Sequence, residues 1–135
     1  MSDAQLFQIA NLVAILSWIA LALQPRRVAP TLRFAVPGVL AVLYIWLIAT
    51  SLPGAQGGFD SLANVKLLFT SDRAVLAGWV HYLAFDLLVG SWEVRDARER
   101  GIPHLLVVPC LFLTFMFGPI GWLLYRALRA ARSPK

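Results

Sequence analysis

Long apolar runs, separated by short charged or glycine-rich stretches, dominate the pattern along the chain. A helix needs about 20 apolar residues to cross the hydrocarbon core of a bilayer. Runs of roughly that length predict membrane-spanning helices at about 5–23, 34–52, 74–97 and 102–128. We therefore predict an all-α integral membrane protein, a four-helix transmembrane bundle built from a single domain over residues 1–135.

The stretch between the second and third runs is different, because it contains several glycines and charged residues. Residues 62–69 within it are short and amphipathic, which is typical of a helix that lies on a membrane surface. Ser71 and Asp72 follow and resemble the N-cap of the third helix. We expect a short interfacial helix between the second and third spans.

The fourth run contains Pro109 and Pro119, the second of them within the sequence GPIG at 118–121. A proline inside a helix removes a backbone donor and kinks or breaks the helix. Carbonyl groups freed in this way inside a membrane need other partners. The fourth span is therefore predicted to be kinked or broken.

Composition supports a membrane protein, since 59% of the residues are hydrophobic and the mean hydropathy is +0.71. These values do not suit a water-soluble domain, and we expect an integral protein of a bacterial inner membrane. The net charge is +5, with the basic residues clustered between apolar runs and at the C-terminus. That distribution suits lipid headgroups more than a nucleic-acid surface, and we expect no nucleic-acid partner.

Basic residues also bear on the orientation in the membrane, because cytoplasmic loops are richer in lysine and arginine. Four complete spans would divide the basic residues into Arg26, Arg27, Arg33, Arg95, Arg98 and Arg100 on one side and Lys66, Arg73, Arg126, Arg129, Arg132 and Lys135 on the other. This equal division predicts no orientation.

Ionisable residues lie on one face of the third span, although charged groups are costly in hydrocarbon. At about 100° per residue, His81, Asp86, Glu93 and Asp96 fall within an arc of about 140°. An acid in the middle of a span is first a candidate for a functional site. The alternative is that Asp86 and Glu93 pair with arginine or histidine from other helices and only fix packing.

Aromatic and amide side chains near this stripe are candidates for binding a hydrophobic ligand. In the first span Asn11 and Trp18 are seven residues apart and share a face, although the amide could equally serve as a structural contact between helices. The candidate substrate-binding residues are Trp79, Tyr82, Phe85, Trp92, Asn11 and Trp18.

Motifs of soluble enzymes are missing from the sequence. The single cysteine, Cys110, excludes an intrachain disulfide and a CxxC motif, and its apolar neighbours indicate a packing role. GxGxxG, Walker, HExxH and GxSxG motifs are also absent.

Two segments, GWVHYLAFDLLVG at 78–90 and IPHLLVVPCLFLTFMFGPIGWLLY at 102–125, resemble the bacterial branch of the abscisic-acid-deficient-four family of membrane proteins. Asn11, Trp18 and Pro25, together with GGFDSLANVKLLFTSD at 57–72, extend the resemblance over nearly the whole chain. It implies a four-helix membrane fold. Plant members are associated with neoxanthin synthesis, so it also implies isomerisation of violaxanthin or another carotenoid or isoprenoid, with no redox cofactor.

Such an isomerisation needs one group to donate a proton to oxygen and another to remove a proton from carbon. Two carboxyl groups in one buried site can supply a protonated and an ionised member. We assign the acid to Asp86 and the base to Glu93 or His81. The preferred hypothesis is thus a carotenoid or isoprenoid isomerase that uses acid–base chemistry and no cofactor.

Other hypotheses remain open at this point. A zinc or iron site could draw on His81, Asp86, Glu93, Asp96 and His104, although a five-residue separation between the first two suits chelation from one helix poorly. The protein could also be a non-enzymatic pigment-binding or lipid-binding module, or an assembly partner of other membrane proteins. A proton or ion pathway would require a homo-oligomer.

Overall fold

All regular structure is helical in the computed structural model, which describes residues 1–23 and 31–132. The elements are α1 (Asp3–Leu23), the π-helical turn η1 (Thr31–Ala35), α2 (Val36–Ser51), α3 (Leu62–Leu68), α4 (Asp72–Glu99), α5 (His104–Phe117) and α6 (Pro119–Arg132). Three helices, at 3–23, 32–51 and 72–99, are long and apolar enough to cross a membrane. The predicted all-helical membrane fold is confirmed. Pro25, Arg26, Arg27 and Lys135 lie outside the described residues.

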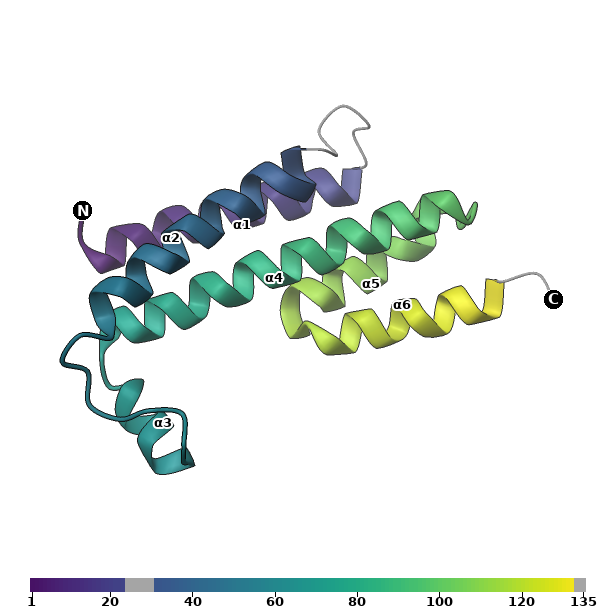
Figure 1. Cartoon of the computed structure of the whole chain (residues 1–135). Coiled ribbons are helices and arrows are strands. Elements are labelled where there is room, and N and C mark those ends of the chain that lie inside the picture. The colour runs from purple at the N-terminus through teal and green to yellow at the C-terminus, as the bar shows by residue number, and fades with distance from the viewer. Residues whose placement is uncertain (24–30, 133–135) are drawn as a thin grey trace.

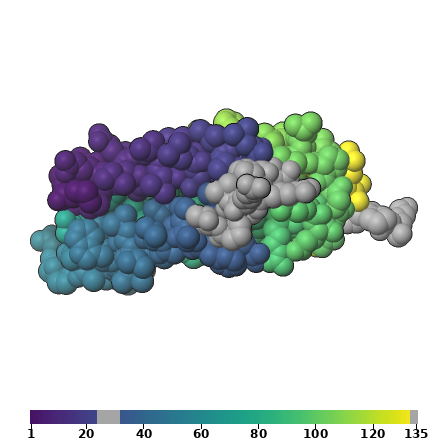
Figure 2. Space-filling model, turned by 90° about the horizontal axis from the view of Figure 1, so that it is seen from above, coloured from purple at the N-terminus to yellow at the C-terminus, as the bar shows by residue number. Residues whose placement is uncertain are grey.

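The longest helix, α4, lies between two layers, with α1 and α2 on one side and α5 and α6 on the other (Figure 1). Figure 2 shows α1 and α2 side by side along one face of the molecule. Helices in a membrane associate through close packing because lipid supplies no hydrophobic driving force. Small buried residues permit this close packing, among them Ala10 and Ala14 of α1 and Ala77 and Ala84 of α4.

Trp18 of α1 packs directly on Gly90 of α4. A Cβ atom placed on this glycine would lie 2.5 Å from Cη2 of Trp18. The indole ring of Trp18 is buried there and also packs against Phe115 of α5, with ring centroids 5.5 Å apart. Trp18 therefore joins α1 to both α4 and α5 at this level of the bundle.

A short helix, α3, forms between α2 and α4 as predicted. Its N-cap is Ser61, whose hydroxyl accepts a hydrogen bond from the Asn64 backbone at 3.2 Å. The Asp60 carboxylate accepts the Asn64 side-chain amide at 2.9 Å, and this bond holds the pKa of Asp60 below its usual value. Ser71 occupies the N-cap position of α4 as expected, but its hydroxyl makes no capping bond.

The fourth apolar run, predicted at 102–128, forms two helices. α5 ends at Phe117, Gly118 adopts a φ of +49°, and α6 begins at Pro119. The prolines predicted a break, but not the reversal of direction that follows. Figure 1 shows α6 turning back beside α5, so that it ends near the C-terminal end of α4.

Two contacts from the Asp96 carboxylate hold α6 in this reversed position. Tyr125 donates its hydroxyl proton to Asp96 at 2.6 Å, and Arg129 approaches the same carboxylate at 3.5 Å. The 14 residues of α5 rise only about 21 Å, which is less than the roughly 30 Å of a hydrocarbon core. We call α5, Gly118 and α6 the re-entrant hairpin, because α5 is too short to cross a bilayer and α6 turns back beside it.

The reversal gathers the positive charge at one end of the molecule. Arg33, Arg95, Arg98, Arg100, Arg126, Arg129 and Arg132 lie toward the end where α4 finishes, whereas among the described residues the α3 end has Lys66 and Arg73. The equal division of charge assumed a complete fourth span, so it does not hold for this fold. Because cytoplasmic segments are richer in basic residues, we expect this arginine-rich end to face the cytoplasm.

Candidate functional site

Asp86 lies in the middle of α4 and faces the tip of the re-entrant hairpin. A Cβ atom placed on Gly118 would be 3.1 Å from Oδ1 of Asp86. The other carboxylate oxygen, Oδ2, is buried and has no hydrogen-bond partner among the described residues. Asp86 forms no ion pair with any described arginine, lysine or histidine, so it does not hold two helices together through an ion pair.

The start of α6 lies next to the Asp86 carboxyl group. The Gly118 carbonyl accepts the first backbone donors of α6, from Gly121 at 3.1 Å and Trp122 at 3.3 Å. A helix N-terminus carries a partial positive charge, and broken helices in membranes use this property to hold anionic groups near the midplane. Asp86 lies close to this N-terminus but accepts no backbone hydrogen bond from it in the described residues.

Tyr82 connects Asp86 to the break in the helix. In a continuous helix, the Phe115 carbonyl would accept the backbone N–H of residue 119, but proline has no such donor. The Tyr82 hydroxyl donates to the Phe115 carbonyl instead, at 2.7 Å. Tyr82 lies one turn before Asp86 on α4, so the two side chains share one face of the helix. The break at Pro119 thus leaves a carbonyl that positions Tyr82 beside Asp86.

Glu93 has a different environment, although it lies on the same face of α4. Its side chain is 0% exposed, and the Thr114 hydroxyl donates to its two carboxylate oxygens at 3.0 and 3.2 Å. Gly121 of α6 packs directly against Thr114, so the hydrogen bond between Thr114 and Glu93 is enclosed between α4, α5 and α6. Glu93 lines none of the cavities described below, and its contacts fasten the hairpin to α4.

A groove runs between α1, α4 and α5 and has two adjoining parts. The first has a volume of about 250 Å³ and is lined by Asn11, Ala14, Ile15, Trp79, Tyr82, Leu83, Phe115 and Met116. The second has a volume of about 240 Å³ and is lined by Ile15, Trp18, Ile19, Ala22, Val108, Leu111, Phe112 and Phe115. Ile15 and Phe115 line both parts, so the two adjoin, and we call them together the α1–α5 groove.

The two ends of the α1–α5 groove differ chemically. At one end, the Trp79 indole donates to the Asn11 side-chain oxygen at 2.8 Å, and Tyr82 lies nearby. The other end is lined by aliphatic and aromatic side chains, of which only Trp18 carries a polar atom, its indole nitrogen. Nε1 of Trp18 is buried without a hydrogen-bond partner among the described residues. The groove suits a long apolar molecule that carries an oxygen group.

The structure brings together only some of the residues predicted to form the site. Asn11, Trp18, Trp79 and Tyr82 line the α1–α5 groove, whereas Asp86 lies one turn beyond Tyr82 on α4 and does not line it.

Three other predicted residues lie elsewhere. His81 is exposed, and its ring lies 5.3 Å from that of Tyr44 and 4.6 Å from that of Phe85, beside α2. Phe85 is 56% exposed on the same side. Trp92 packs edge-on against Tyr125 of α6.

The five residues considered for a metal site do not converge. No group of three or more His, Cys, Asp or Glu side chains suited to hold a metal ion occurs in residues 1–23 and 31–132. Asp96 is engaged by Arg100 at 3.0 Å as well as by Tyr125 and Arg129. The His104 ring donates to the Ala22 carbonyl at 2.8 Å and so ties α5 to α1. The five residues therefore do not form a single site in the part of the chain that the structure describes.

Sequence reasoning did not single out Thr114, the Phe115 carbonyl or Gly118 as parts of the site. The signal that could have found the carbonyl was Pro119, because an interior proline always leaves the fourth residue before it without its usual donor. Glu93 and Thr114 gave no such signal, since their contact depends on how α5 packs against α4.

This fold and site define a polytopic helical membrane protein. It has a carboxyl group at the tip of a re-entrant hairpin and an apolar groove near that tip. Residues 5–125 match the model of the ABA DEFICIENT 4-like (ABA4-like) family, and the chain belongs to this family. Comparisons with curated proteins and with solved structures gave no match.

Proposed function

We propose that this protein binds a carotenoid or another hydrophobic isoprenoid in the α1–α5 groove and isomerises it without a cofactor. One observation carries the proposal: the apolar groove reaches Tyr82, which lies one turn from Asp86 on α4, and the buried Oδ2 of Asp86 has no hydrogen-bond partner among the described residues. Apolar walls with few polar groups are typical of sites for hydrophobic ligands. We also propose that the protein belongs to the bacterial branch of the family and that it is located in a bacterial inner membrane.

The two buried polar atoms without partners support an oxygenated ligand. Buried polar groups almost always have a hydrogen-bond partner, yet Trp18 Nε1 and Asp86 Oδ2 have none among the described residues. An indole N–H donates to oxygen, and a protonated carboxyl group donates as well. An epoxide or hydroxyl oxygen on the isoprenoid would satisfy this kind of donor.

In the proposed reaction, protonated Asp86 gives its proton to the substrate oxygen as the carbon–oxygen bond opens. The resulting carboxylate then removes a proton from a neighbouring carbon, which forms the new double bond and restores the acid. The substrate gains and loses one proton, so the product is an isomer and no electron acceptor is needed. Tyr82 positions the carboxyl group, while the enclosed Glu93 fastens the hairpin.

A second candidate function is a non-enzymatic pigment-binding or lipid-binding module. The observation that favours it is that neither predicted carboxyl group lines the groove, because Glu93 is enclosed by Thr114 and Asp86 lies beyond Tyr82. In a binding module, the isoprenoid would be recovered unchanged from the protein whatever residue stands at position 86.

Filling the groove tests the binding step that both functions require. Ile15 is 46% exposed and lines both parts of the groove, so Ile15→Trp places an indole ring in the space of the ligand. We expect at least a tenfold fall in the isoprenoid recovered by organic solvent from the purified variant, which corresponds to about 1.4 kcal/mol of binding free energy.

Leu16→Trp is the matched control, since Leu16 is 57% exposed on the same helix and lines neither part of the groove. Its extract should equal that of the wild-type protein. Equal amounts of isoprenoid in the two tryptophan variants would contradict binding in the α1–α5 groove. Extracts that contain only bulk phospholipid in the wild type would contradict the ligand class itself.

A further inference from the structure

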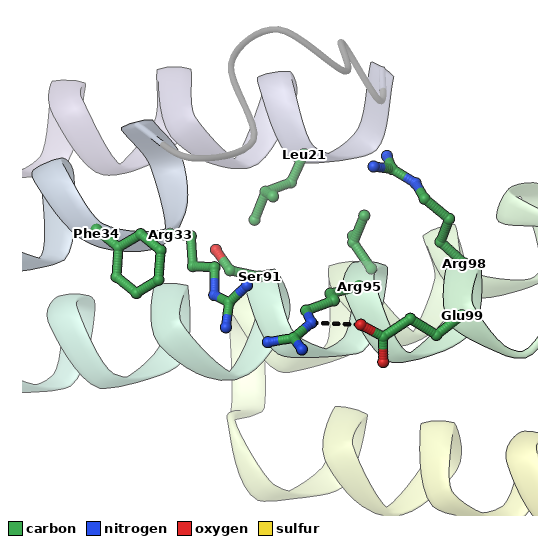
Figure 3. A pocket seen from close by; sticks show the side chains of 8 residues that line it. Leu21, Arg33, Phe34, Ser91, Arg95, Arg98 and Glu99 are labelled. Carbon is green, nitrogen blue, oxygen red and sulfur yellow. Dashed lines mark hydrogen bonds and ion pairs between the residues drawn. The ribbon is translucent and has the colours of Figure 1, made fainter.

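A second pocket opens at the arginine-rich end, away from the α1–α5 groove. It has a volume of about 300 Å³ and is lined by Leu21, Arg33, Phe34, Ser91, Val94, Arg95, Arg98 and Glu99. The lining therefore comes from α1, η1 and α4. Figure 3 shows the Arg33 and Arg95 guanidinium groups extending toward one another, with Arg98 on the side of α1.

The pocket holds more positive charge than its own carboxylate can balance. Arg95 is paired with Glu99 at 2.6 Å, but neither Arg33 nor Arg98 forms an ion pair with a described carboxylate. The Arg33 guanidinium instead lies over the Phe34 ring, 4.7 Å from its centroid. Guanidinium groups that approach one another repel, so an anion between them would be stabilised by both. Arginine binds phosphate oxygens in a planar, two-point geometry.

The position and the apolar wall of the pocket indicate where such an anion comes from. Leu21 is in the last turn of α1, and Arg95 and Arg98 are in the last turns of α4. This is the level at which a spanning helix meets the lipid headgroups. Leu21, Phe34 and Val94 complete the lining with apolar surface, which can receive the first carbons of a lipid chain below a headgroup.

We propose that this pocket is a specific site for the phosphate headgroup of an anionic membrane phospholipid. Arg33 and Arg95 bind the phosphate oxygens while Arg95 stays paired with Glu99, Arg98 adds charge from the side of α1, and the apolar wall receives the adjoining chain. Basic pockets between membrane helices are known to hold anionic headgroups in this manner. The site is separate from the α1–α5 groove, so the proposal does not depend on the proposed isomerase.

The test is native mass spectrometry of the purified full chain after exchange into phosphatidylglycerol, phosphatidylcholine or sodium phosphate. We expect one phosphatidylglycerol to stay bound, at a level at least tenfold above phosphatidylcholine. The Arg33→Ala/Arg98→Ala double variant should lose this preference. Arg132→Ala, which removes an arginine at the same end but outside the pocket, should keep it.

Three results would overturn the proposal. Equal retention of phosphatidylcholine would show that the headgroup charge is not recognised. Equal loss of phosphatidylglycerol in Arg132→Ala would show a diffuse attraction to the whole end of the molecule. Displacement of phosphatidylglycerol by an equal concentration of sodium phosphate would assign the site to a free phosphate. A melting temperature within a few degrees of the wild type shows that the double variant remains folded.

Discussion

Asp86→Asn is expected to lower turnover of the isoprenoid by at least about 100-fold, because a positioned general acid typically contributes 10²–10⁴-fold to a rate. The amide has nearly the same shape as the carboxyl group, but it cannot deliver a proton to an oxygen or take one from a carbon. The measurement is the ratio of the two isomers of equal mass in membranes of a host that makes epoxy-carotenoids.

Asp72→Asn is the matched control, since Asp72 is an exposed acid in the first turn of the same helix. It should leave the isomer ratio unchanged. Normal turnover in a folded Asp86→Asn protein would eliminate the acid–base proposal. If the variant and the wild type both carry one unchanged isoprenoid, the protein is the binding module described above.

Gly121→Ala is expected to prevent the re-entrant hairpin from closing. A Cβ atom at this position would lie 2.5 Å from Cα of Thr114 and would also collide with its backbone nitrogen and hydroxyl. Overpacking typically costs 1–3 kcal/mol, and a clash with backbone cannot be relieved by a change of rotamer. We therefore expect the free energy of unfolding to fall by about 3 kcal/mol or more. The measurement is the melting temperature of the purified protein, which should fall markedly.

Gly38→Ala provides the comparison for this variant. Gly38 lies in α2, and a Cβ atom there would meet nothing within 4 Å. Alanine also favours a helix over glycine by about 1 kcal/mol, so this variant should be as stable as the wild type or slightly more stable. An unchanged melting temperature for Gly121→Ala would mean that α5 and α6 do not pack as closely as the structure has them.

The three long helices could be predicted from the sequence because an apolar run of spanning length has few alternatives in a membrane. The reversal at Gly118 could not, since the pattern of residues 102–128 is equally that of one kinked span. The decision depends on contacts between distant residues, such as Tyr125 with Asp96 and Gly121 with Thr114. Arg126 and Arg129 lie one turn apart, within and just beyond the predicted span. Two arginines there argue locally against a complete crossing by this segment.

The candidate site was predictable only in part for a related reason. The positions of residues along a helix give the angles between their side chains, but they do not show which neighbouring helix packs against each side chain. His81 and Asp86 fall within one arc of about 140°, yet α2 lies against the first and the hairpin tip against the second. The enclosure of Glu93 depends on Thr114, which belongs to another helix.

The place of Asp86 at the hairpin tip and the gathering of arginines at one end both depend on α5 and α6 turning back within the membrane. Cysteine accessibility tests this most directly, in a Cys110→Ala background with single cysteines at Lys66, Arg98 or Arg132, labelled in spheroplasts with a membrane-impermeant maleimide. The account predicts that Lys66→Cys is labelled from outside, while Arg98→Cys and Arg132→Cys are both labelled only after the membrane is broken. Labelling of Arg132→Cys together with Lys66→Cys, on the side opposite Arg98→Cys, would mean that the fourth segment crosses completely and would contradict it.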